Sequence, residues 1–146
     1  MTSIERLRAA IKAQDPSEFE RALTASFDQR TTTPEAQTEL AALLNDALPL
    51  TWHTRHEDLV RAMQQLRDPS SATPLYNATL AQYEYLAHDS GDNLARKCIW
   101  ALADIGTEQS RAYLTELAKH ANAGIATYAQ KRLDKWDAEL HRKPTR

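Results

Sequence analysis

The chain has 146 residues, of which 42% are hydrophobic and 26% are charged, as in one ordinary globular domain. Ala and Leu dominate, whereas there are three Gly and a single Val, so strand formers are nearly absent and an all-α fold is expected. The net charge of −2 is divided unevenly, with −6 on residues 1–92 and +4 on residues 93–146. Because no basic surface covers the chain as a whole, general nucleic-acid binding is not expected.

Three further features of the sequence favour a soluble, cytoplasmic protein. The lone Cys98 has no partner for an internal disulfide, and its apolar surroundings predict a small buried residue rather than a reactive thiol. Residues 1–6 do not resemble the start of a signal peptide. No apolar stretch approaches the roughly 18 residues that a membrane-spanning helix needs, so no membrane partner is expected.

Capping residues and apolar positions at helical spacing predict eight helices joined by short breaks. In the first part of the chain, Thr2, Asp15 and Thr33 each stand where a helix N-cap is expected. The fourth helix is expected to begin with a capping box made by Thr54 and Glu57.

The second half continues the same pattern. The fifth helix is expected to run to about Ala87, before a loop at residues 88–92. Gly106 is expected to end the sixth helix, and Thr107 and Asn122 are expected to cap the seventh and the eighth.

The apolar positions of these helices repeat along the chain, which distinguishes a repeat array from a simple bundle. Leu59 and Met63 recur 35 residues later as Leu94 and Cys98. A second set recurs at an offset of 31: Leu94, Cys98, Leu102 and Ile105 align with Ile125, Ala129, Leu133 and Trp136.

The stretch from Asn93 to Gly106, which reads NLARKCIWALADIG, resembles the second helix of a HEAT repeat. It has an Arg near its start, then small residues, and a final Ile-Gly. Residues 68–80 resemble the first helix of a repeat of the phycobilin-lyase-like HEAT subtype, and the resemblance covers about residues 53–138. It implies an α-solenoid of about four HEAT-like helical hairpins, which stack on one another and present a concave docking surface.

We therefore expect one domain over residues 1–146. Its parts would be degenerate N-terminal hairpins at 1–50, clearer repeats at 51–138 and a basic tail at 139–146.

The segment from Thr51 to Val60, which reads TWHTRHEDLV, is the most distinctive in the chain, and it has three interpretations. On a helix, His53 and His56 would be close enough to share a metal ion. Their order, H-x-x-H-E, matches neither of the related metalloprotease patterns, so we predict no metal site and no cofactor. In the second interpretation, Trp52 plugs the core and His56 is a packed histidine with a satisfied ring nitrogen.

The third interpretation is recognition of a partner. Glu57 and Asp58 project away from the apolar face of their helix. Together with Glu84, Asp89 and Asp92 they would form an acidic patch for a basic partner.

The order Trp52-His53-x-x-His56-Glu57-Asp58 resembles an entry segment of small bacterial HEAT-like proteins that accompany toxins. The resemblance implies an immunity protein, which binds a cognate toxin, here a basic toxin domain, and neutralises it.

Trp100 lies about 140° away from the apolar face of its own helix, so its hairpin does not bury it. It would either pack between adjacent repeats or serve as an exposed aromatic anchor for a partner. Arg96 and Lys97 beside it would form ion pairs between repeats or contact an acidic group.

The sequence thus predicts a non-catalytic protein-binding module rather than an enzyme. The alternatives are a general HEAT adaptor, a metal-dependent enzyme, and a nucleic-acid-binding protein that would use a basic set interleaved with acids. The predicted partner-binding residues are Trp52, His53, His56, Glu57, Asp58, Asp89, Asp92 and Trp100.

Overall fold

The computed structural model describes residues 2–28, 33–86 and 92–142, and all of the regular structure in these ranges is helical. The longer helices are α1 (Ser3–Ala13), α2 (Pro16–Asp28), α3 (Pro34–Ala47), α4 (His56–Leu66), α5 (Ala72–Leu80), α6 (Asn93–Ile105), α7 (Glu108–Leu117), α8 (Ala123–Asp134) and α9 (Trp136–Arg142). Two short 3₁₀ helices, η1 (Pro69–Ser71) and η2 (Glu84–Leu86), flank α5.

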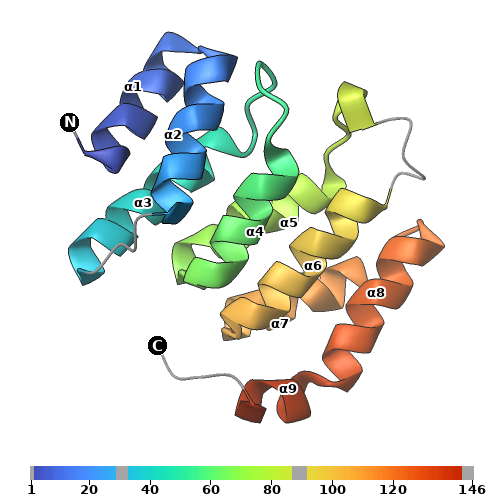
Figure 1. Ribbon diagram of the computed structural model, residues 1–146. Coiled ribbons are helices and arrows are strands. Elements are labelled where there is room, and N and C mark those ends of the chain that lie inside the picture. Colours follow the sequence, from blue (N-terminus) through green and yellow to red (C-terminus); the bar gives the residue numbers. More distant parts are fainter. Residues whose placement is uncertain (1, 29–32, 87–91, 143–146) are drawn as a thin grey trace.

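The helices form stacked hairpins, in agreement with the predicted α-solenoid (Figure 1). Helices α4, α6 and α8 pack side by side in one layer, and α5 and α7 pack against each other in a second. The hairpin of α1 and α2 stands at one end of the array, where α1 also contacts α3. Among the described helices, none is both long and apolar enough to cross a membrane.

Most of the predicted helix starts are confirmed by hydrogen bonds. The capping box of Thr2 and Glu5 is complete, and the Asp15 carboxylate accepts the backbone N–H of Glu18 at 3.2 Å. The side chains of the other caps also accept N–H groups of their own first turns; these caps are Thr33, Thr107 and Asn122.

The predicted capping box of Thr54 and Glu57 is wrong. Helix α4 begins one residue later than predicted, with Arg55 at the N-cap and no side-chain cap bond from it. Instead, the hydroxyl of Tyr85 accepts the backbone N–H of His56 at 3.3 Å, so a distant residue caps this helix.

The fifth helix was predicted to run to about Ala87, and this is also wrong, because α5 ends at Leu80. The chain then turns into extended backbone at Ala81, with φ −79° and ψ 154°. This turn carries the Tyr83 hydroxyl to the carbonyl of Leu48, where it donates a hydrogen bond of 3.0 Å. The end of α5 thus coincides with a contact to another hairpin. Such a contact cannot be predicted from the sequence around residue 80.

One hydrophobic core runs through the described hairpins, from Leu7 in α1 to Trp136 at the start of α9. Trp136 does not continue the eighth helix, as its spacing suggested, but begins a ninth after a break at Lys135. Cys98 is fully buried, as predicted. On one face of the layer of α4, α6 and α8, called the open face below, Arg61 of α4 and Arg96 and Trp100 of α6 are exposed.

Candidate functional site

Trp52, His53 and His56 form a stack of rings inside the molecule rather than a surface feature. Phe19 of α2 contacts the Trp52 ring at a centroid distance of 5.4 Å. The rings of His53 and His56 are stacked at 4.3 Å, and the His56 ring stacks on Tyr83 at 3.9 Å. The stack thus joins the first hairpin to the segment that follows α5.

Both imidazoles have their ring nitrogens engaged in hydrogen bonds. His53 Nδ1 accepts the N–H of Arg55 at 3.0 Å, so Nε2 carries the proton and donates to the carbonyl of Ala47 at 2.8 Å. His56 Nε2 likewise donates to the carbonyl of Leu50 at 2.7 Å, and Nδ1 accepts the Tyr85 hydroxyl at 2.7 Å. The two histidines are therefore neutral and fully bonded.

Burial lowers the pKa of both groups. The pKa of His56 falls to about 4, because desolvation outweighs the hydrogen bond to Leu50 and the neighbouring His53 lowers it further. The pKa of His53 is lowered mainly by desolvation. A neutral imidazole whose nitrogens are both bonded to protein has no lone pair left for a metal ion.

These observations agree with the packing interpretation of the segment. His53 and His56 are 1% and 0% exposed, so they are not available to a partner, and we remove them from the candidate site. Trp52 is half-buried, and its Nε1 is buried without a hydrogen-bond partner in the described part of the chain. Across the described ranges, no group of three or more His, Cys, Asp or Glu side chains could hold a metal ion.

In the predicted acidic patch, Glu57 and Asp58 each lie beside a cation. Glu57 accepts a hydrogen bond of 2.6 Å from Lys97 of α6, and Asp58 lies 3.6 Å from Arg55, which also pairs with Glu20. Lys97 thus forms the ion pair between repeats that was one of its two predicted roles. Because each carboxylate already has a cation beside it, the charge left for a basic partner is small.

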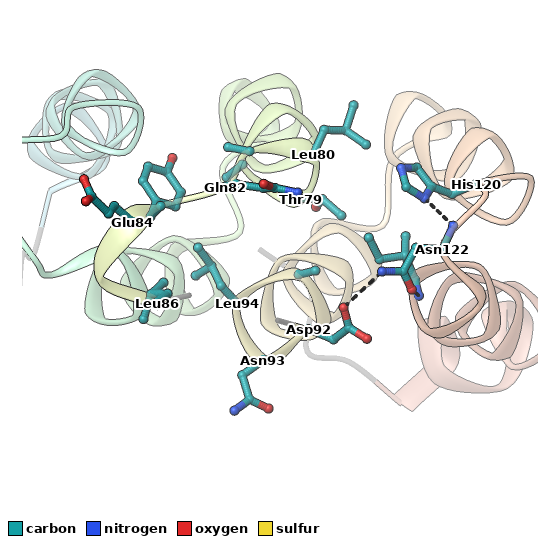
Figure 2. A pocket seen from close by; sticks show the side chains of 15 residues that line it. Thr79, Leu80, Gln82, Glu84, Leu86, Asp92, Asn93, Leu94, His120 and Asn122 are labelled. Atoms are coloured by element: carbon teal, nitrogen blue, oxygen red, sulfur yellow. Dashed lines mark hydrogen bonds between the residues drawn. The ribbon is translucent and has the colours of Figure 1, made fainter. Parts of the chain in front are cut away.

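Of the three other acids in the predicted patch, Glu84 and Asp92 line a pocket. Asp89 lies outside the described residues. Asp92 precedes α6, and its carboxylate accepts the side-chain amide of Asn122 at 3.3 Å (Figure 2). A Cβ on Gly124 would lie 2.5 Å from Asp92 Oδ2, so the carboxylate sits against the first turn of α8.

A pocket opens beside Asp92, between the end of α5, η2 and the first turns of α6 and α8 (Figure 2). Its volume is about 570 Å³. Glu84 and Asp92 of its lining belong to the predicted acidic patch, but the apolar wall between them depends on how the repeats pack. Its lining includes the side chains of Leu80, Glu84, Leu86, Asp92 and Leu94.

Trp100 packs between repeats, as one of its two predicted roles requires, and it also stays partly exposed. The guanidinium of Arg132 in α8 lies 3.6 Å from its ring centroid, so one side of the ring packs between repeats. The residue nevertheless remains 40% exposed. Arg132 is itself held by Glu139 of α9 at 2.7 Å. The contact of Arg132 with Trp100 was not predicted, because it joins residues 32 positions apart.

Contacts on either side set the register of the open face. Lys97 meets Glu57, and Asp104 accepts the side-chain amide of Gln64 at 2.6 Å, so α4 and α6 run in parallel with an offset of 40 residues. Trp100 lies between these two contacts on α6. It is therefore the central exposed aromatic residue of the layer formed by α4, α6 and α8.

The fold and this face define a helical-repeat protein with an open helical layer. The family model for the PBS lyase HEAT-like repeat matches residues 94–120, which cover α6 from Leu94, the turn at Gly106, and α7. The chain therefore contains a HEAT-like repeat, in the region where the sequence resembled one most closely. A search of curated proteins and a search of solved structures each gave no match.

Proposed function

We propose that the protein is a non-catalytic protein-binding module that uses the open face of α4, α6 and α8. The proposal is carried by one observation, the 40% exposed Trp100 held in place by Arg132. Tryptophan and arginine are the residues that contribute most to protein–protein binding energy. A ring that is already fixed on one side loses little conformational entropy when a partner covers the other.

The surroundings of Trp100 also suit a protein partner. The side chains of Arg61 and Arg96 are exposed, and within the described residues neither side chain has an ion pair or a hydrogen bond. Lys97 and Glu57 lie nearby as a bonded pair. An apolar centre with a charged rim is the usual anatomy of a protein interface.

The finer role that we propose is that of an immunity protein, which binds a cognate bacterial toxin and neutralises it. This role rests on the resemblance of residues 52–58 to small bacterial HEAT-like proteins, and on no contact in the structure. A general HEAT adaptor is the alternative. An adaptor would bind several chains and would protect no cell from a toxin.

The test is a pull-down from host lysate with wild type, Trp100→Ala and Thr115→Ala as baits, read by mass spectrometry. Thr115 is exposed on α7, in the other layer, and serves as the matched control. We expect wild type and Thr115→Ala to retain one stoichiometric protein and Trp100→Ala to lose it. Equal retention by all three baits would place binding elsewhere on the molecule.

Two further measurements separate the roles. Co-expression of the captured partner with the chain should rescue growth if the partner is a toxin, and an adaptor would give no rescue. Elemental analysis of the purified protein addresses the metal-enzyme alternative, because a stoichiometric transition metal would contradict a purely binding role.

A further inference from the structure

The pocket between η2 and the first turns of α6 and α8 is large enough to receive a side chain of another protein. Leu80, Leu86 and Leu94 supply apolar wall, and Leu80 is 44% exposed although it is a large hydrophobic residue. Exposed apolar surface beside a hollow favours an occupant with a hydrocarbon part.

Among the described residues that line the pocket, Glu84 and Asp92 supply carboxylates, His120 supplies an imidazole, and there is no Lys or Arg. Glu84 is exposed and has no hydrogen bond or ion pair to any described residue. Figure 2 shows these two acids on either side of Leu94, and both border the pocket.

Helix N-termini favour anions, and the first turns of α6 and α8 both border this pocket. At the N-terminus of α8, the carboxylate of Asp92 already occupies the position that favours an anion. This carboxylate is bonded to Asn122 and lies against Gly124. A second anion would be repelled by Asp92 and Glu84. Within the described residues neither Asp92 nor Glu84 forms an ion pair, and Glu84 also has no hydrogen bond, so its carboxylate is the freer of the two to attract a cation.

We propose that this pocket binds a lysine or arginine side chain of the partner protein. The alkyl stem would lie against Leu80 and Leu94, and the cationic end would pair with Glu84. This inference rests on the proposed function and adds the chemistry of the partner. Asn93 of the pocket and Trp100 lie on one face of α6, about 10 Å apart along its axis, so one partner can cover both.

The direct test uses a small probe, N-acetyl-arginine methylamide, titrated into the ¹⁵N-labelled protein and followed by NMR. The amide signals of Asn93 and Leu94 should shift and saturate with a Kd in the millimolar range. N-acetyl-glutamine methylamide should cause no saturable shift. Glu84→Gln should weaken binding of the arginine probe by about threefold to fivefold, which is the usual value of one accessible charge pair.

Glu116→Gln is the matched control, because it makes the same change at an exposed position of α7. It should leave the titration unchanged. The proposal is overturned if the arginine and glutamine probes behave alike, if the shifts lie elsewhere, or if Glu84→Gln and Glu116→Gln have equal effects.

The proposed function and the pocket fail in different ways. If Trp100→Ala loses the captured partner while Glu84→Gln binds it with unchanged affinity, the binding module stands and the pocket proposal is wrong. If the arginine probe binds as expected but no partner is captured, the pocket stands and the use of the Trp100 face is wrong.

Discussion

The guanidinium of Arg132 lies 3.6 Å from the centre of the Trp100 ring, while its Nη1 lies 2.7 Å from Glu139. One buried side chain thus links α6, α8 and α9. The arrangement stiffens the proposed binding residue and fastens the last helix to the array.

Replacing Arg132 by Met should destabilise the protein by about 3 kcal/mol, because it leaves the Glu139 carboxylate nearly buried without its cation. Urea denaturation measures the change. Lys119→Met removes an exposed pair with Glu116 and should cost less than about 0.5 kcal/mol. Equal losses from the two variants would show that the Arg132 contacts are energetically no different from a surface pair.

Tyr85→Phe should destabilise the protein by about 1–2 kcal/mol, since it removes the hydroxyl that serves the ring and the backbone N–H of the buried His56. The control is Tyr113→Phe. Its hydroxyl bonds Thr73 at 2.7 Å at an exposed position, where water replaces the lost partner. Thermal or urea unfolding of both variants decides the matter, and a smaller loss for Tyr85→Phe would contradict the role of its hydroxyl.

The stability of the protein should fall as the pH is lowered from 7 towards 4. The pKa of His56 is lowered from 6.5 to about 4 in the folded state, so the unfolded chain binds more protons in this window. The contribution of neutral His56 to the free energy of unfolding is complete above the pKa that His56 has in the unfolded chain. It is lost as the pH falls to the pKa that His56 has in the folded protein, a change of about 3 kcal/mol. His53 acts in the same direction. Urea denaturation at several pH values should show a shallower slope for His56→Gln than for wild type, and parallel slopes would refute the assignment.

Gly106→Ala should cost about 1–2 kcal/mol. Gly106 ends α6 with φ +72°, a conformation that favours glycine, and a Cβ there would lie 2.9 Å from Leu140 Cδ1. Gly124→Ala is the comparison, because its Cβ would meet the Asp92 side chain, which can turn away. Thermal unfolding should therefore show the larger loss for Gly106→Ala; the reverse order would count against the backbone argument.

Cys98 should not react with a thiol reagent such as DTNB while the protein is folded. The thiol is completely buried, and burial raises its pKa to about 12, so thiolate is scarce at neutral pH. One equivalent should react promptly in denaturing urea. Rapid reaction of the folded protein would mean that the α5–α6 hairpin opens frequently.

Much of the architecture could be read from local sequence. Leu94, Cys98 and Leu102 mark a buried face by their spacing alone, because a helix of 3.6 residues per turn brings them together. Thr33, Thr107 and Asn122 predict helix starts, because the side chain of an N-cap residue bonds backbone N–H groups only two or three positions away. The HEAT-like repeat at residues 94–120 follows from the same local periodicity.

The candidate site depended on contacts between residues distant in the chain, which no local pattern encodes. His53 and His56 could as well have faced solvent; Phe19, far earlier in the chain, covers the His53 ring, and Tyr83 and Tyr85, 27 or more positions later, cover His56. The sequence by itself determined an all-helical array with its caps and its core positions, since these arise within one or two helical turns. The tertiary structure alone decided that Glu57 is paired, that Trp100 is half covered, and that a pocket opens beside Asp92, because each requires two repeats in register.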